Sequence, residues 1–380
     1  MLTPITAELL ASGRIANPVF RREAQLYLDI EADFRAQVED FGLPFADPVV
    51  GPVASPAAKP AAAPAASAAA ATTTADPPAP AHIMEPADPW VTSLASRGLT
   101  IANDRRSLHT GWISPSCVSC RTGTGTATYL ISTQCPRECF FCFNPNQANY
   151  ERLRQELDDP AARLTELHGK GVPFHDLALT GGEPLLHKAQ TEAFFRTAQR
   201  LYPDAYTRLY TSGAFFDADC ARTLASAGLR EIRFSIKTDD TPGALATTFE
   251  RMSLAREHLP HVVVEMPVMP DEQARMEELL CALDELGIDG INLLELCFPY
   301  HNAAEFARRG YALKPRLFRV FYNYSYAGGL PVAGSEDVCL RLLGFALDRG
   351  LRLGVHYCSL ENKFSGQVYL QNVGSRDAYP

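Results

Sequence analysis

Residues 135–142 read Cys-Pro-Arg-Glu-Cys-Phe-Phe-Cys and place three thiols in a CxxxCxxC spacing. The apolar residues 127–132 precede this segment and are typical of a strand, so we expect the thiols on a loop at a strand end. Cysteine thiolates are the usual ligands of iron–sulfur clusters, and a cubane has four irons to fill. Three neighbouring thiolates fill three of them and leave the fourth iron open. An open coordination position distinguishes a catalytic metal site from a closed structural one.

A zinc knuckle or a disulfide loop is the alternative for these three cysteines. Zinc sites favour a CxxC pair joined to a second pair, and disulfides consume cysteines two at a time. A loop with three cysteines fits neither arrangement well.

The CxxxCxxC spacing, with Phe141 directly before the last cysteine, resembles the signature of the radical S-adenosylmethionine (radical SAM) superfamily. The resemblance implies that Cys135, Cys139 and Cys142 hold a [4Fe–4S] cluster whose open iron binds SAM, with Phe141 packed beside both. An electron from the reduced cluster would cleave SAM to methionine and a 5′-deoxyadenosyl radical, which abstracts hydrogen from an organic or peptidyl substrate. A flavodoxin- or ferredoxin-type reductant is implied as a partner.

The stretch Thr180-Gly181-Gly182-Glu183-Pro184 resembles the GGE segment of the same family. Two glycines let the backbone approach a ligand closely, and a carboxylate beside them suits an ammonium group. By resemblance, Gly181, Gly182 and Glu183 meet the amino group of SAM. An ordinary strand-to-helix turn is the alternative for this stretch.

Two further segments are similar to SAM-binding stretches of the family. Thr211-Ser212-Gly213 stands where relatives have Thr-Asn-Gly, and Ser235 and Lys237 lie late in the fourth expected strand of the series. The resemblance implies contacts with the carboxylate and ribose of SAM, and Lys237 would neutralise the carboxylate. A solvent-facing lysine at a strand end is the alternative.

Residues 265–270, Glu-Met-Pro-Val-Met-Pro, resemble a proline-containing run of pyruvate formate-lyase-activating enzymes and similar glycyl-radical activases. Activation of a glycyl-radical enzyme is therefore one expected reaction. Modification of a peptide or a small molecule is the other, and the sequence does not choose between them.

Strand-like and helical segments alternate beyond Cys142. This rhythm predicts βαβ units, a parallel sheet and an α/β fold of the partial (β/α)6-type TIM barrel class. The chemistry of such barrels lies at the carboxyl ends of the strands. After the first expected strand at residues 127–132, the series continues with residues 177–179, 206–210, 232–236, 262–264, 291–294 and 353–357.

A second group of cysteines is a candidate second metal site, for an iron–sulfur cluster or zinc. Cys117 and Cys120 form a CxxC pair, and Cys297 and Cys358 each follow an apolar run. Small buried hydrophobic residues or a turn are the alternative. The remaining cysteines, Cys220, Cys281 and Cys339, lie in helical patterns and are expected in the core.

The catalytic residues remain open, with Cys297, Tyr300, His301 and Cys358 as candidates near strand ends. Neighbouring Glu295 and Asn302 are read as a satisfied buried carboxylate and a helix cap.

Three regions are expected along the chain. Residues 1–47 form a helical segment, and an apolar face at Leu26, Ile30, Phe34 and Val38 predicts a helix that docks on this protein or on a partner. Residues 48–88 are an Ala/Pro-rich linker that cannot bury enough apolar surface to fold. Residues 89–380 form the radical SAM domain, with its core at about 120–300 and a C-terminal extension.

Composition narrows the partners. The 380 residues are 46% hydrophobic and 21% charged, with a net charge of −9. An acidic balance argues against nucleic acid as a main partner, and no apolar run is long enough to span a membrane. Ten cysteines without an export signal predict a reducing cytoplasm. Two other classes stay open, namely a closed iron–sulfur or zinc module without SAM chemistry, and a scaffold that works through its N-terminal segment.

Overall fold

The computed structural model describes residues 6–16, 18–46, 89–103, 105–120, 125–146, 150–237, 240–315, 317 and 329–363, without the side chains of residues 19, 20, 23 and 30. The expected linker at 48–88 lies outside these residues.

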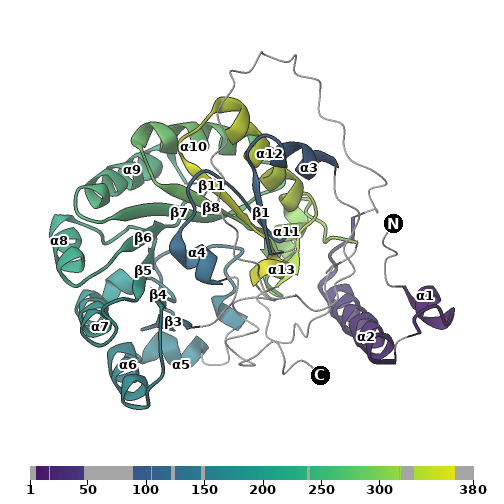
Figure 1. Ribbon diagram of the computed structural model, residues 1–380, viewed down its shortest axis with the longest axis horizontal. Helices are drawn as coiled ribbons and strands as arrows, with labels where there is room; N and C mark the ends of the chain where they lie inside the picture. The colour runs from purple at the N-terminus through teal and green to yellow at the C-terminus, as the bar shows by residue number, and fades with distance from the viewer. Residues whose placement is uncertain are drawn as a thin grey trace.

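Within the described residues, one curved nine-stranded sheet runs in the order β1-β2-β11-β8-β7-β6-β5-β4-β3, which places β1 and β3 at its edges (Figure 1). Strands β3 to β8 and β11 are parallel, whereas β1 and β2 pair antiparallel. The strands are β1 (Thr100–Ala102), β2 (Ser107–Thr110), β3 (Thr126–Leu130), β4 (Asp176–Thr180), β5 (Tyr206–Thr211), β6 (Glu231–Phe234), β7 (His261–Val268), β8 (Gly290–Glu295) and β11 (Gly354–Cys358). A separate pair joins β9 (Cys297–Phe298) and β10 (Leu330–Pro331).

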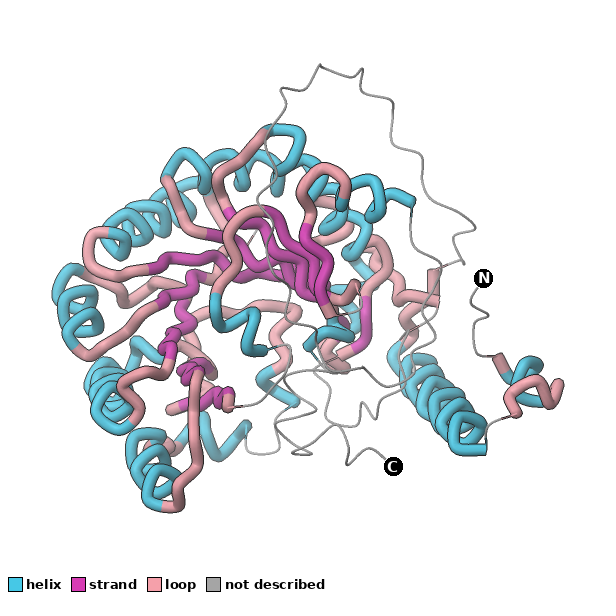
Figure 2. The backbone as a smooth tube through the Cα atoms, viewed as in Figure 1, coloured by secondary structure: helices cyan, strands magenta, loops and turns pink. Residues whose placement is uncertain are grey.

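Helices connect successive parallel strands and cover the outer face of the sheet (Figures 1 and 2). The covering helices are α6 (Pro160–Gly169), α7 (Lys188–Leu201), α8 (Ala218–Ser226), α9 (Pro242–Arg256), α10 (Gln273–Leu286) and α12 (Ser335–Arg349). Shorter elements are α3 (Pro89–Ala95), α4 (Pro115–Cys120), η1 (Asn144–Asn146), α5 (Tyr150–Gln155), η2 (Pro184–His187), α11 (Ala303–Arg308) and α13 (Leu360–Asn362). The α/β fold of the partial TIM barrel class is confirmed, and every expected strand falls on a parallel strand of the sheet.

Local sequence explains where these elements begin and end. Strand β4 is continuously apolar at Leu177–Leu179, because a parallel strand is covered on both faces. Helix α8 begins where the Asp217 carboxylate accepts the backbone N–H of Cys220 at 2.8 Å. Helix α10 ends at Gly287, whose φ of 70° lies in the left-handed region that favours glycine.

The main apolar core lies between the sheet and the covering helices. Phe194 and Phe195 of α7 are fully buried there with strand residues such as Leu209 and Ile232. Each such side chain contributes roughly 1.5–3 kcal/mol when removed from water. Cys220 and Cys339 are buried in this core, as expected, and Cys281 is half-buried.

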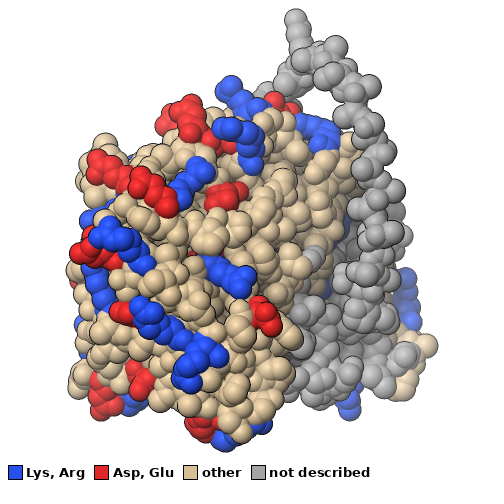
Figure 3. Space-filling view, turned by 60° about the vertical axis from the view of Figure 1, so that its left-hand side comes forward, with Lys and Arg blue, Asp and Glu red and all other residues tan. Residues whose placement is uncertain are grey.

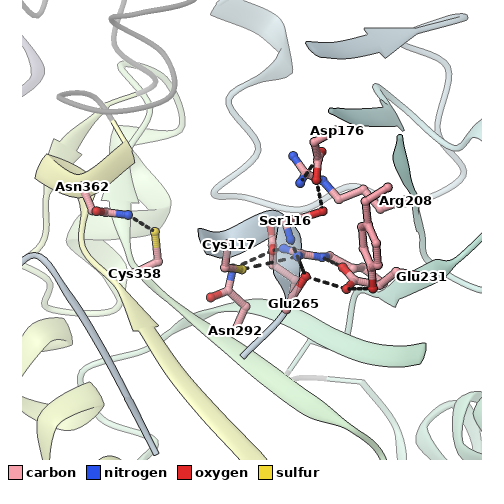
Figure 4. Close-up of polar contacts among 12 residues, drawn as sticks. Ser116, Cys117, Asp176, Arg208, Glu231, Glu265, Asn292, Cys358 and Asn362 are labelled. Carbon is pink, nitrogen blue, oxygen red and sulfur yellow. Dashed lines mark hydrogen bonds and ion pairs between the residues drawn. The ribbon is translucent and has the colours of Figure 1, made fainter. Parts of the chain in front are cut away.

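The inner side of the sheet carries charges instead. Arg233 of β6 forms an ion pair with Glu231 at 2.6 Å, and Arg208 of β5 forms one with Asp176 at 2.8 Å. Helix α4 lies in this polar interior (Figures 1 and 4). Ser114, just before α4, donates to Glu231 at 2.5 Å. Because a buried charge is costly unless it is paired, this network fixes α4 in one place.

A second apolar core joins the N-terminal helices to the other end of the chain. Helices α1 (Ala7–Ala11) and α2 (Pro18–Phe41) precede the linker, and the buried face of α2 includes Phe34 and Val38. These residues pack in one cluster with Phe298 and Leu330. The predicted docking of the helix on this protein is thus observed. Leu26 is only half-buried, and the side chain of Ile30 lies outside the described residues.

On the face drawn in Figure 3, lysine and arginine side chains are interspersed with acidic ones. Among the described helices, ion pairs join residues one helical turn apart, such as Glu166 with Lys170 and Glu192 with Arg196. In the part of the chain that the structure describes, no helix combines the length and the apolar composition needed to cross a bilayer.

Replacement of Val38 by Asp should release α2 from the body of the protein. The side chain of Val38 has 0% exposure, so the new carboxylate would be buried without a partner. Ala36→Asp makes a similar change on the exposed face of the same helix and serves as the control. We expect rapid proteolytic cleavage within residues 18–41 for Val38→Asp only. Equal cleavage rates for the two variants would contradict the docked position.

Candidate functional site

The cluster loop, residues 131–143, leaves the carboxyl end of β3 and carries the three thiols. Cys135 is exposed, Cys139 and Cys142 are half-buried, and all three are free. The backbone N–H of Cys142 donates to the carbonyl of Cys139 at 3.0 Å, which turns the loop back on itself. Burial raises the pKa of all three thiols, that of Cys139 to about 11. A bound metal reverses this effect because it deprotonates a coordinating thiol.

The cluster loop lies directly against Gly181 and Gly182 at the end of β4. A Cβ atom on Gly182 would come within 1.9 Å of the Gln134 carbonyl oxygen, and one on Gly181 within 2.6 Å of the Ser132 oxygen. The N–H of Gly182 donates to that Ser132 oxygen at 2.9 Å. Both glycines are therefore required by the contact between the loop and the strand end, whatever they also do for a ligand.

Glu183 is the centre of the wall beside this contact. It is 1% exposed, and its carboxylate accepts from the Thr211 hydroxyl at 2.7 Å, from the Ser212 N–H at 2.7 Å and hydroxyl at 2.5 Å, and from the Leu185 N–H at 3.1 Å. These four donors use the acceptor capacity of an ionised carboxylate. Through these bonds, Thr211 and Ser212 connect the end of β5 to the turn that follows β4.

Arg137 fastens the cluster loop to the end of β6. Its guanidinium donates to the Ser235 carbonyl at 3.3 Å and forms an ion pair with Asp240 at 3.3 Å. Burial raises the pKa of Cys139, and the positive charge of Lys237, which lines the same cavity, acts in the opposite direction. Strand β6 ends at Phe234, so Ser235 and Lys237 lie just beyond the strand rather than within it.

The side chains of His301 and Asn302 also contact the backbone of the cluster loop. Nε2 of His301 lies 2.6 Å from the Cys142 carbonyl oxygen, and the side-chain amide of Asn302 donates to the Phe140 carbonyl at 3.0 Å. Asn302 occupies the N-cap position of α11, as expected, but its side chain makes no capping hydrogen bond. Both side chains hold the loop backbone.

Aromatic side chains connect the cluster loop to the N-terminal helix α2 through packing contacts. Phe140 and Phe141 meet edge to face at a centroid distance of 5.1 Å, and both pack against the second core. Tyr300, with a left-handed φ of 61°, stacks on Phe34 of α2 at 6.3 Å. Its buried hydroxyl has no hydrogen-bond partner among the described residues. Tyr300 therefore belongs to the packing of α2 and does not line the cavity described next.

One large cavity of about 1060 Å³ opens over the carboxyl ends of the parallel strands. The sequence candidates that line it are Cys135, Cys139, Phe141, Cys142, Gly181, Gly182, Glu183, Thr211, Ser212, Ser235, Lys237, Cys297, His301 and Cys358. The structure thus brings together the three loop thiols and all the expected SAM-contacting residues. Tyr210, Glu265 and Leu294 also line the cavity.

Of the four cysteines expected to form a second site, Cys297 and Cys358 line the cavity together with the three loop thiols, whereas Cys117 and Cys120 are not among its lining residues. Burial raises the pKa of Cys297 to about 11. Glu295 is a satisfied buried carboxylate, as read from the sequence, with an ion pair to Lys314 and the Leu360 N–H at 2.9 Å.

The donor chemistry of the loop fits an iron–sulfur cluster. Three free thiols line the same cavity, together with the side chain of Lys237 and the closely packed backbone at Gly181 and Gly182. Each cysteine of a cubane binds its own iron, so the thiols need not converge on one point. Within the described residues, no three Cys, His, Asp or Glu side chains are grouped as they would be around a single metal ion.

Sequence reasoning missed the residues that support the loop from a distance. Arg137 stood inside the decisive segment, but its contact with Asp240 depends on the fold. The contact of His301 with Cys142 joins residues 159 positions apart. No local pattern reveals such contacts, although the His-Asn pair directly after a strand end is a signal that places both residues at the correct edge of the sheet.

Relatives of this chain include a protein of Methanocaldococcus jannaschii named as a glycyl-radical enzyme activating enzyme. The two are 24% identical over 238 residues, which cover 60% of this chain and 59% of that relative. Among solved structures, SuiB of Streptococcus suis bound to its precursor peptide SuiA is 13% identical, with a TM-score of 0.44 over 64% of this chain and 51% of that one. The radical SAM methyltransferase TsrM of Kitasatospora setae is 18% identical, with a TM-score of 0.41 over 58% and 52% of the two chains.

The sequence model of the Radical SAM superfamily matches residues 129–283. The matched range contains the cluster loop, the Gly181–Glu183 turn and strands β4 to β7. These are the elements that build the cavity wall around the three thiols. Residues 129–283 of the chain thus match the radical SAM superfamily.

Proposed function

We propose that the protein is a radical SAM enzyme that abstracts hydrogen from an organic or peptidyl substrate. The observation that carries this proposal is the set of three free loop thiols in one cavity, with the Gly181–Glu183 turn as its wall. A [4Fe–4S] cluster bound by Cys135, Cys139 and Cys142 supplies the electron that splits SAM into methionine and a 5′-deoxyadenosyl radical. The protein positions the reactants and excludes water.

The chain's own residues hold SAM in this proposal. The backbone around Gly181 and Gly182 receives the amino group, and Phe141 packs beside the nucleotide. Lys237 supplies a positive charge for the SAM carboxylate, with Ser235 beside it. Glu183 acts indirectly, because its carboxylate already accepts four hydrogen bonds, from Leu185 of η2 and from Thr211 and Ser212 at the end of β5. It keeps the two strand ends in register under the ligand.

The cavity has room for a substrate next to SAM. Ligand pockets usually measure about 300–1,000 Å³, and the volume of this cavity, about 1060 Å³, lies just above that range. The name of the M. jannaschii relative favours a protein substrate, by activation of a glycyl-radical enzyme. Because the match covers 59% of that relative, modification of a peptide or small molecule remains a second proposal.

The reductant and the location follow from the same chemistry. Delivery of a single electron suits a flavodoxin or ferredoxin as the partner. Cysteines that are free in the fold and a cluster that needs reduction suit a reducing cytoplasm.

Anaerobic reconstitution tests the proposed reaction. With dithionite and SAM, the full chain should form 5′-deoxyadenosine, and Cys139→Ala should abolish its formation because one cluster ligand is lost. Cys281→Ala removes a half-buried thiol of α10, outside the site, and should leave the product yield unchanged. Product formation at the same rate in Cys139→Ala, or none in the unmodified chain, would contradict the proposal.

Cys297 distinguishes an open cluster from a closed metal module. It lines the same cavity as the three loop thiols, so it is a candidate for the fourth ligand of a closed module. If the fourth iron is open, Cys297→Ser should keep the full iron content and the same affinity for SAM in calorimetry. Loss of iron in Cys297→Ser, together with absence of SAM binding to the unmodified protein, would support the closed module instead.

A further inference from the structure

A second group of thiols lies on the inner side of the curved sheet and outside the cluster loop. Cys117 and Cys120 are one helical turn apart on α4 and share a face of that helix. Cys358 ends β11 and lines the cavity. Figure 4 draws both sulfurs, with Cys117 in the polar network of α4 and Cys358 beside Asn362 at the end of β11. All three thiols are free.

Helix α4 is anchored so that its cysteines have a fixed place. Ser114 donates to Glu231 at 2.5 Å, and the Ser116 hydroxyl donates to Asp176 (Figure 4). Arg233 then places Nη2 3.4 Å from the sulfur of Cys117. A buried guanidinium beside a sulfur stabilises the thiolate form, which is the form that binds metal.

Cys358 has its own oriented donor. The side-chain amide nitrogen of Asn362 lies 3.2 Å from the Cys358 sulfur (Figure 4). Asn103 donates to the carbonyl oxygen of the same amide at 2.5 Å, which assigns its NH₂ group to the sulfur side. Hydrogen bonds to ligand sulfurs are one of the means by which proteins set the potential of iron–sulfur clusters.

One buried donor beside α4 lacks an acceptor. Nε of Arg208 is buried without a hydrogen-bond partner among the described residues, although another nitrogen of its guanidinium pairs with Asp176. Asp176 also accepts from the Ser116 hydroxyl, so Arg208 lies beside the helix that carries Cys117 and Cys120. Buried donors are normally satisfied, so an anionic group such as a thiolate-bound cluster fits beside Arg208.

We propose that Cys117, Cys120 and Cys358 bind a second iron–sulfur cluster in the interior of the sheet, next to the SAM cavity. The three thiols come from two elements and are not grouped around one ion position, whereas a cubane offers each cysteine its own iron. This centre does not depend on the SAM chemistry proposed above, since it uses none of the cluster-loop cysteines.

A variant without the first site isolates the second. The full chain with Cys135→Ala, Cys139→Ala and Cys142→Ala is reconstituted anaerobically with iron and sulfide, and the metals are measured per chain. The proposal predicts about four irons and four sulfides, the content of one cubane. It also predicts an electron paramagnetic resonance signal after reduction.

Single changes in this background then identify the ligands. Cys358→Ser should lose most of the iron, and Cys120→Ser provides a second test at another half-buried position. Cys281→Ser is the matched control and should keep it. Circular dichroism on each variant confirms the fold.

Three results would overturn the second cluster. They are an iron-free first-site variant that remains folded, unchanged iron after both Cys358→Ser and Cys120→Ser, and one zinc per chain in place of iron. Failure of the unmodified protein to cleave SAM would not bear on this result, because iron in the first-site variant is measured without SAM.

Discussion

The close contact between the cluster loop and the end of β4 is the constraint on which the rest of the site depends. Gly182 leaves space for no side chain, because the Gln134 carbonyl would lie 1.9 Å from a Cβ atom. The next residue, Glu183, donates its backbone N–H to the same Gln134 oxygen at 2.7 Å, and its carboxylate accepts the hydroxyl of Thr211 at the end of β5. One short turn thus joins the cluster loop to two strand ends. The rigid sheet thereby fixes the position of the loop that carries the thiols.

The same loop is held on its other sides by contacts that arrive from far along the chain. The guanidinium of Arg137 donates a hydrogen bond to a carbonyl at the end of β6. On the side of the second core, the side chains of His301 and Asn302 form hydrogen bonds with carbonyl groups of the loop. Tyr300 links this grip to α2, so the N-terminal helix supports the site through packing. A site fixed in advance loses little freedom when it binds its ligands, which is how rigid positioning contributes to catalysis.

Most of the scaffold could be predicted because its signals are local. Continuous apolar runs such as Leu177–Leu179 mark parallel strands, and the thiol spacing marks the cluster loop without any knowledge of the fold. The antiparallel strand β2, the insertion of α4 into the sheet and the part played by His301 escaped prediction. Each depends on a partner more than a hundred residues away, as in the contact of Ser114 with Glu231. Gly181 and Gly182 were predicted from their resemblance to a ligand-binding turn, and the structure shows that they make room for the backbone of the cluster loop.

The most direct test of this account is whether SAM coordinates an iron of the cluster held by the loop. The reconstituted, reduced protein should be mixed with SAM carrying ¹⁵N in its amino group and studied by electron–nuclear double resonance. The account predicts a nitrogen hyperfine coupling that is absent in Cys139→Ala. A cluster signal that is the same with and without SAM, and that shows no coupling to the label, would contradict it.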